Sequence, residues 1–317
     1  MKSWLELFRI SNLPTVWTNI AAGAAIGCMV IPRDAFTYVT VVAIILAILA
    51  GTCLYSGGMV LNDVFDIDTD RKERPDRPIP SGRIPEQSAG LVGWGLLLAG
   101  IGFAGFSGMG GILLPVVALV IAVLSVLYNG LHERTAWAIA ALALCRALLY
   151  PLGALACAGI QAFDASALLL IGVIGGGAFV HTVALSLVAR GEMQSQTRHG
   201  VLARGYGTIA LAIPPGMVLL MMFMLLGTEK HSEVWPWPGI GLAIAFVILL
   251  AWLARNIRAL MGDPPRVLRF ILGSIAAFCL YDAAIVAMLP APYVLLALIP
   301  LLLFAVVHLA HRSIPGT

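Results

Sequence analysis

A run of acidic and amide side chains directly follows a long apolar segment early in the chain. It reads NDVFDIDTD and supplies Asn62, Asp63, Asp66 and Asp70. If the apolar helix continues through this run, the spacings i, i+4 and i+8 place Asn62, Asp66 and Asp70 on one face, with Asp63 one step round from them. Carboxylates this close repel one another unless a cation lies among them, and such oxygen ligands suit Mg2+, which also binds substrate phosphates. We therefore predict that these four residues bind magnesium together with a diphosphate, and that the three aspartates are catalytic.

A basic segment continues directly from the acidic run. The forked guanidinium of arginine matches phosphate oxygens, so cations at this position complement a diphosphate. The candidates are Arg71, Lys72, Arg74, Arg77 and Arg83. A simpler interpretation of each half is also open: the acids form a solvated helix end, and the arginines are the positive charges that flank membrane helices on the cytoplasmic side.

The composition is that of a polytopic membrane protein. Hydrophobic residues make up 60% and charged residues 11% of the 317 residues, whereas soluble domains carry about 25% charged residues. The net charge of +3 is too small to indicate nucleic-acid binding. All five cysteines fall within apolar runs, a pattern that indicates neither a disulfide framework nor a zinc site.

The apolar residues fall into ten runs, each close to the ~20 residues that cross the ~30 Å hydrocarbon core of a membrane. The runs cover residues 13–31, 37–64, 88–107, 110–129, 136–158, 166–189, 206–227, 238–258, 268–289 and 292–310. No internal repeat or linker interrupts them. We therefore expect one transmembrane domain over residues 1–317.

The basic residues are distributed unevenly between the two ends of these runs. With the N-terminus in the cytoplasm, sixteen of the nineteen Lys and Arg residues lie on the inner side, and only Arg33 and Lys230 lie on the outer side. Cytoplasmic loops carry the excess of positive charge in membrane proteins. We therefore expect an integral protein of a bacterial inner membrane, with the N-terminus and the acidic run on the cytoplasmic side.

Two adjacent motifs resemble one protein family. The acidic run at residues 62–70, followed by RPIPSGR at residues 77–83, resembles the first aspartate-rich motif and the loop after it in the UbiA superfamily of intramembrane prenyltransferases. The resemblance implies an all-α bundle of nine or ten transmembrane helices around a central cavity. It further implies Mg2+-dependent transfer of a prenyl group from a prenyl diphosphate to a lipophilic or aromatic acceptor, within membrane lipid and without nucleic acid as a partner.

The chain departs from this family where the resemblance implies a second acidic motif, at the cytoplasmic end of the sixth run. That region reads ALSLVARGEMQSQTRHG, and its only acid is Glu192. Either the metal site is reduced, with Glu192 as a remaining ligand, or Arg190 and Arg198 contact the diphosphate directly, or the chemistry is lost. Tyr128 and Arg134 loosely match a tyrosine and a basic residue of the family and are further candidates for substrate binding. These departures resemble a divergent, EboC-like bacterial branch.

The complete first motif favours an enzyme of the prenyltransferase type, although a terpene cyclase uses the same ionisation without a foreign acceptor. A non-catalytic protein that binds isoprenoid lipids or docks a partner on the same scaffold is an alternative. A transporter is another, because Arg146 and Asp282 are ionisable residues within apolar runs. We expect these two residues to pair between helices or to face the cavity, where Arg146 would contact a substrate.

Overall fold

The structure is a computed structural model that describes residues 2–32, 35–107, 110–131, 135, 137–193, 205–226, 237–262, 266–289 and 293–313. Within these ranges every regular element is helical. The α-helices are α1 (Lys2–Leu7), α2 (Leu13–Val30), α3 (Tyr38–Phe65), α4 (Ile67–Glu73), α5 (Glu86–Phe106), α6 (Leu113–Leu131), α7 (Ala138–Ala147), α8 (Leu149–Cys157), α9 (Ala165–Met193), α11 (Ile213–Leu226), α12 (Trp237–Leu260), α13 (Val267–Val286) and α14 (Leu298–Ser313). The short 3-10 helices η1 (Ile10–Asn12), η3 (Ile160–Ala162) and η5 (Tyr293–Ala297) lie between them.

The ten apolar runs correspond to helices of two kinds. Eight helical segments of the described chain are long and apolar enough to cross a membrane, and Gly205–Leu220 and Leu295–His311 are shorter apolar helices. Each predicted run therefore matches one apolar helical segment. The prediction of an all-α transmembrane bundle is confirmed, with eight to ten helices in it.

The fifth run forms two helices instead of one. α7 ends at Ala147 and α8 begins at Leu149. Pro151 has no amide hydrogen to donate, and in a continuous helix its ring would collide with the carbonyl of Ala147, four residues earlier. The break therefore follows from the sequence, and it leaves Arg146 in the last turn of α7.

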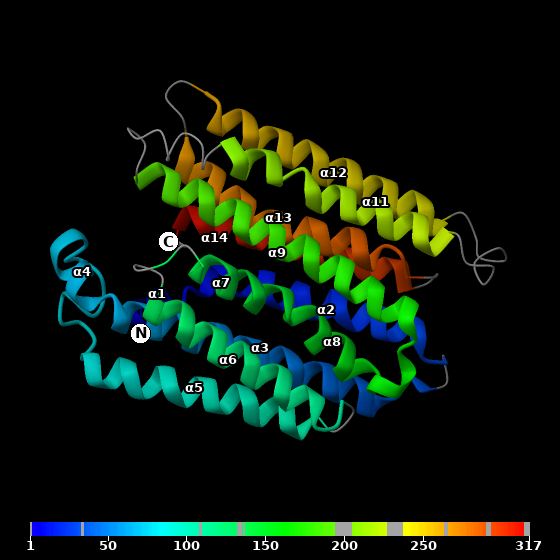
Figure 1. Cartoon of the computed structure of the whole chain (residues 1–317), viewed down its shortest axis with the longest axis horizontal. Coiled ribbons are helices and arrows are strands. Elements are labelled where there is room, and N and C mark those ends of the chain that lie inside the picture. Colours follow the sequence, from blue (N-terminus) through cyan, green and yellow to red (C-terminus); the bar gives the residue numbers. More distant parts are fainter. Residues whose placement is uncertain are drawn as a thin grey trace.

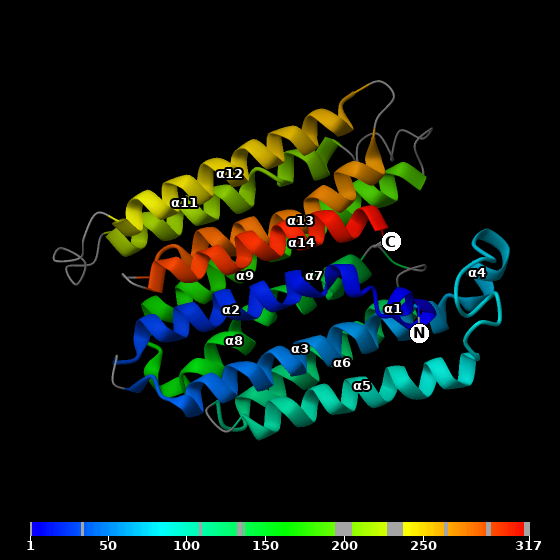
Figure 2. The same ribbon diagram turned by 180° about the vertical axis from the view of Figure 1, so that it is seen from behind.

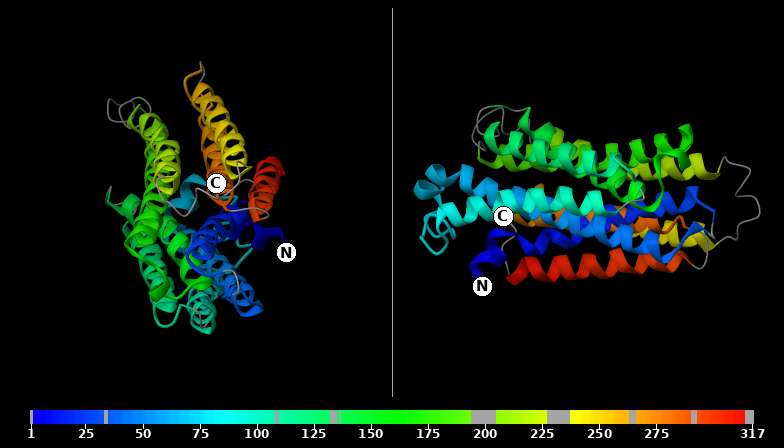
Figure 3. Two further views of the ribbon diagram at one scale, coloured as in Figure 1. Left: turned by 90° about the vertical axis from the view of Figure 1, so that its right-hand side faces the viewer. Right: turned by 90° about the horizontal axis from the view of Figure 1, so that it is seen from below.

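The helices lie side by side along the long axis of the molecule, as Figures 1 and 2 show. The N-terminus, the C-terminus and α4 lie at one end of the bundle. The end-on view in Figure 3 shows α11 and α12 on the side of the bundle opposite α5. Segments that are far apart in the sequence therefore lie near one another at the end of the bundle that carries α4.

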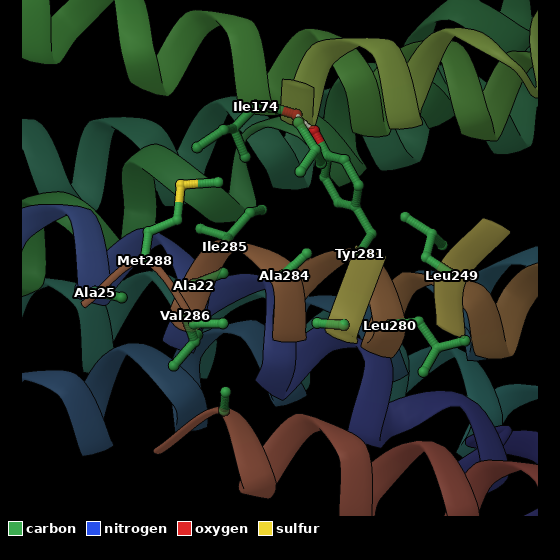
Figure 4. Close-up of a cluster of buried hydrophobic side chains, with 14 of the residues drawn as sticks. Ala22, Ala25, Ile174, Leu249, Leu280, Tyr281, Ala284, Ile285, Val286 and Met288 are labelled. Atoms are coloured by element: carbon green, nitrogen blue, oxygen red, sulfur yellow. Dashed lines mark hydrogen bonds between the residues drawn. The ribbon is translucent and has the colours of Figure 1, made fainter. Parts of the chain in front are cut away.

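α13 forms the centre of one half of the bundle. It is more completely buried than any other described span, and it packs against α2, α9, α12 and α14. Tyr281 of α13 donates a hydrogen bond of 3.0 Å to the backbone oxygen of Ile174 in α9. Figure 4 shows small and branched side chains, such as Ala22 of α2 and Ile285 of α13, that fill the space around this contact. α13 also contributes Ile275 and Phe278 to the wall of the cavity described below.

Candidate active site

The acidic run lies at the end of α3, where the helix is interrupted. α3 ends at Phe65 because Asp66 adopts φ −89° and ψ 5°, outside the helical region, and α4 begins at Ile67. Ile67 is buried in a small apolar cluster with Leu7 and Val60, which turns the chain at this point. The 28 residues of α3 span about 42 Å, more than the ~30 Å hydrocarbon core, so the acids lie toward the membrane surface.

The interruption divides the four polar side chains into two pairs. The Asn62 amide donates to the Asp66 carboxylate over 3.2 Å. Asp63 and Asp70 instead share Arg77, whose Nη1 lies 3.3 Å from Asp63 and 2.6 Å from Asp70. Both carboxylates are buried, at 6% and 4% exposure, so each needs a counterion. The Asn62–Asp66 contact agrees with the expected i, i+4 stacking, whereas Asp70, beyond the interruption at Asp66, shares Arg77 with Asp63.

The RPIPSGR loop places Arg77 against these acids. The amide of Ile84 donates to the carbonyl of Pro78 over 3.0 Å, and the Ser81 hydroxyl donates to the carbonyl of Arg77 over 2.7 Å. Gly82 closes the turn with a left-handed φ of 75°, a conformation that glycine adopts without strain. Ile79 and Ile84 are buried in the same cluster as Ile67. Apolar burial thus folds the loop back onto the end of α3, and Arg77 reaches the acids as a consequence.

Arg9 is a site residue that the sequence did not reveal. Its backbone is left-handed, with φ 47° and ψ 50°, which is uncommon for a residue other than glycine and marks local strain. Its guanidinium donates to Asp63 over 3.4 Å and lines the cavity. The only sequence signal is a basic residue immediately before the first apolar run, and 54 residues separate it from its partner.

An apolar cavity of about 250 Å3 opens beside the acidic run. It brings together three of the predicted substrate-binding residues, Asn62, Tyr128 and Arg146, and adds Arg9 to them. Leu54 and Phe278 are among its apolar lining residues. The cavity therefore has polar groups at the end of α3 and hydrocarbon along its walls, an arrangement that suits an amphipathic ligand.

Arg146 and Asp282 do not form an ion pair with each other. Asp282 is completely buried and accepts hydrogen bonds from Asn19 over 2.7 Å and from the Tyr150 hydroxyl over 2.8 Å. Arg146 donates to the Thr15 hydroxyl over 2.6 Å, and its guanidinium carbon lies 4.1 Å from the centre of the Phe278 ring. The expectation of a direct pair between helices is therefore wrong, since each group is satisfied by other partners. The alternative, a cavity-facing Arg146, is the arrangement found.

The other cations of the basic segment do not line the cavity. Arg71 pairs with Asp68 at 3.1 Å and with Glu86 at 3.7 Å, and Arg83 pairs with Glu6 at 3.5 Å. Lys72 and Arg74 are exposed. Of the cations predicted in this segment to bind the diphosphate, Arg77 contacts Asp63 and Asp70.

The region of the second acidic motif is described only in part. Arg190 donates to the carbonyl of Thr135 over 3.5 Å at the end of α9. Arg134 and Arg198 lie outside the described residues, as does the side chain of Glu192. From α9, Thr182 and Leu185 line the cavity, and none of the lining residues that the structure describes is acidic.

The acidic run has the donor chemistry for Mg2+, although its side chains do not form a complete cage. Across the described ranges, no three acidic, histidine or cysteine side chains lie close enough together to hold a metal ion. Mg2+ does not require such a cage, because it keeps several waters and binds through one or two carboxylates plus substrate phosphates. The acidic run therefore offers the one or two carboxylates that such a metal needs, and a diphosphate would have to supply further ligands.

Parts of the sequence are similar to two named enzymes. Digeranylgeranylglyceryl phosphate synthase of Saccharolobus solfataricus is 34% identical over 125 residues, which are 39% of this chain and 39% of that protein. The chloroplastic chlorophyll synthase of Oryza sativa is 36% identical over 90 residues, which are 28% of this chain and 24% of that protein. The matched stretches thus span less than half of these relatives.

Solved structures share the fold over most of the chain. A UbiA homologue from Aeropyrum pernix K1 superposes with a TM-score of 0.62 at 16% identity, covering 87% of this chain and 96% of that one. A UbiA homologue from Archaeoglobus fulgidus bound to GPP and Mg2+ gives a TM-score of 0.52 at 15% identity, covering 89% and 99%. Residues 20–260, which include the acidic run and most of the helices around the cavity, match the UbiA prenyltransferase family. The chain therefore belongs to the UbiA prenyltransferase family.

Proposed function

We propose that this protein is a Mg2+-dependent intramembrane prenyltransferase, which transfers a prenyl group from a prenyl diphosphate to a lipophilic or aromatic acceptor. One observation carries the proposal, namely that a cluster of buried charges lies beside an apolar cavity. Asp63 and Asp70 pair with Arg9 and Arg77 in this cluster. Arg9 and the neighbouring Asn62 line the cavity. A diphosphate needs the polar end, and a prenyl tail needs the hydrocarbon walls. The GPP and Mg2+ in the Archaeoglobus homologue support the same pairing of ligands.

The residues of the chain have separable parts in this reaction. Mg2+ held by Asn62, Asp63, Asp66 and Asp70 would supply positive charge to the departing diphosphate. Arg9 and Arg77 add fixed guanidinium groups, which stabilise the charge that develops as the carbon–oxygen bond breaks and its electron pair passes to the diphosphate. The apolar walls hold the tail and exclude water, so the allylic cation survives until the acceptor attacks and loses a proton.

Arg77 contributes to the site in two states. Its guanidinium neutralises Asp63 and Asp70 in the structure. If Mg2+ bound to those carboxylates, the guanidinium would be free to contact phosphate oxygens, which it matches with two parallel hydrogen bonds. Arg77 would then hold the diphosphate as well as the acids.

Arg146 identifies the place for the polar part of the acceptor. In the part of the chain that the structure describes, it makes no ion pair and donates only to Thr15. Thr15 lies in the first turn of α2, and Arg146 lines the same cavity as Asn62 and Arg9. A polar acceptor group that contacts Arg146 would therefore share the cavity with the prenyl chain.

We place the acidic end in the cytoplasm of a bacterial inner membrane. The support is the excess of Lys and Arg on that side of the chain. Both termini and α4 lie at this end in Figure 1. Prenyl diphosphates and Mg2+ are available in the cytoplasm, so the orientation matches the chemistry.

The test is incubation of the purified protein in detergent with Mg2+ and labelled prenyl diphosphates of several chain lengths. We expect diphosphate release that stops when a chelator removes Mg2+.

A second function, isoprenoid-lipid binding without catalysis, has one observation in its favour, since the described part of α9 contributes no acid to the cavity. A protein that binds isoprenoid lipids without catalysis would retain the labelled substrate tightly and release no diphosphate.

A further inference from the structure

A second cavity lies between α12, α13 and α14, outside the prenyltransferase site. Its volume is about 250 Å3. The polar residues that line it come from all three helices: Arg255 and Asn256, Arg269, and His308 and His311. These residues lie near the end of α12, the start of α13 and the end of α14, which is the end of the bundle that carries α4 in Figure 1.

A buried amide group with no partner lines this cavity. Asn256 is 3% exposed, and its side-chain nitrogen has no hydrogen-bond partner. A Cβ at position 273 would collide with the Asn256 carboxamide, so Gly273 creates the space that the amide occupies. The neighbouring Trp252 indole is satisfied by the Gly273 carbonyl over 2.8 Å. An unpaired buried donor of this kind costs free energy unless a ligand accepts from it.

Two arginines at the cavity add positive charge. The guanidinium of Arg255 lies 4.7 Å from the centre of the Trp252 ring, which holds it over the cavity. Arg269 lines the cavity from α13 and is exposed. Neither arginine forms an ion pair with a described residue, and none of the described lining residues is acidic. The cavity therefore presents donors and positive charge to an anion.

The surroundings favour a lipid over a soluble anion. Leu268 and Leu272 lie on the same wall as Arg269, and Leu268 is 57% exposed. Arg255 precedes the end of α12 at Leu260 by five residues, about 7.5 Å, a depth at which arginine extends its charge to the headgroup layer. Basic pockets between membrane helices on the cytoplasmic side suit phosphate headgroups.

We propose that the cavity between α12, α13 and α14 binds the phosphate of an anionic phospholipid from the adjoining leaflet. Arg255 and Arg269 contact the phosphate, the Asn256 amide donates to one of its oxygens, and the Leu268 side chain meets the start of an acyl chain. The site is independent of prenyl transfer, so it holds whether or not the proposed function is correct.

The test uses the full chain in detergent, titrated with dioctanoyl phosphatidylglycerol and followed by native mass spectrometry. Arg255→Gln with Arg269→Gln keeps a polar, unbranched side chain at each position and removes two charges from the cavity. We expect binding to weaken about tenfold to thirtyfold, because each basic residue near an anionic headgroup contributes ~1 kcal/mol. The matched control, Arg258→Gln with Arg266→Gln, removes the same charge from the same helix ends outside the cavity and should bind within about twofold of the parent. Asn256→Leu, which removes the buried donor, should also weaken binding.

Three results would overturn the proposal. The first is an equal loss in the cavity and control variants, which would show general attraction between charges. The second is unchanged affinity in the cavity variants when thermal unfolding shows that they are folded. The third is displacement of the lipid by inorganic phosphate alone at the same concentration, which would make a soluble anion the occupant.

Discussion

Arg77 donates to Asp70 over 2.6 Å, and this contact joins the RPIPSGR loop to the end of the helix that carries the acids. The same guanidinium nitrogen lies 3.3 Å from Asp63. One loop residue therefore neutralises two buried carboxylates that lie seven positions apart in the sequence. Arg77 therefore links the loop to both acids, and Arg9 adds a second cation to Asp63.

Replacement of Arg77 by alanine should destabilise the protein in a metal-dependent way. The change leaves Asp63 and Asp70 buried without their shared cation, a loss of about 3 kcal/mol for a buried pair. Mg2+ should restore part of this loss because it supplies the missing positive charge. Thermal unfolding in detergent, with Mg2+ and with a chelator, measures both effects.

Arg71→Ala is the matched control for that experiment. Its pair with Asp68 is exposed, and such pairs contribute less than about 1 kcal/mol. A parent-like unfolding temperature for Arg77→Ala, or equal destabilisation with and without Mg2+, would show that the Arg77 contacts do not stabilise the acidic run.

Two substitutions at Arg9 separate its backbone from its side chain. Arg9→Gly and Arg9→Ala both remove the guanidinium and should weaken binding of a prenyl diphosphate about tenfold, as loss of a charge-assisted contact does. Glycine tolerates the left-handed backbone, so Arg9→Gly should be about 1 kcal/mol more stable than Arg9→Ala. Equilibrium binding of a labelled prenyl diphosphate and thermal unfolding test the two parts, and parent-like binding by Arg9→Gly would remove Arg9 from the site.

Arg146 and Asp282 should respond independently to substitution. Asp282→Ala leaves the donors of Asn19 and Tyr150 unpaired, which costs about 1–3 kcal/mol for each buried group. Arg146→Met should leave stability less affected but reduce transfer to an acceptor more than binding of the prenyl diphosphate. The double variant should lose close to the sum of the two single losses, because the residues share no hydrogen bond and are coupled only by the attraction between their charges. A double variant that is clearly more stable than the sum would show coupling between them.

The fold was predictable from the sequence because the bilayer restricts the choice. Each apolar run of about 20 residues has to satisfy its own backbone hydrogen bonds, so each forms a helix. The break at Leu148 was also encoded, since Pro151 excludes a continuous helix through Ala147. The number of complete crossings was less certain because the runs at 206–227 and 292–310 form shorter apolar helices than the others.

The site was predictable only where its residues are neighbours in sequence. The acids and Arg77 lie within 16 positions of each other, and their chemistry was apparent from spacing. The helix is interrupted at Asp66, where Ile67 is buried in a cluster with Leu7, a contact between distant segments, so the local pattern did not predict where α3 ends. Arg9 reaches Asp63 across 54 positions, and no local pattern reports such a contact.

The most direct test of the account compares three aspartates of the same run. Asp63→Asn, Asp66→Asn and Asp68→Asn each remove one negative charge with little change in shape, but the Asp68 side chain is 87% exposed and pairs only with Arg71. The measurement is Mg2+-dependent release of diphosphate from a labelled prenyl diphosphate by the purified protein. The account predicts a loss of about 100-fold or more for Asp63→Asn and Asp66→Asn and activity within about twofold of the parent for Asp68→Asn. Equal activity in all three variants and the parent would contradict it, because the acidic run would then be a helix end without a role in the chemistry.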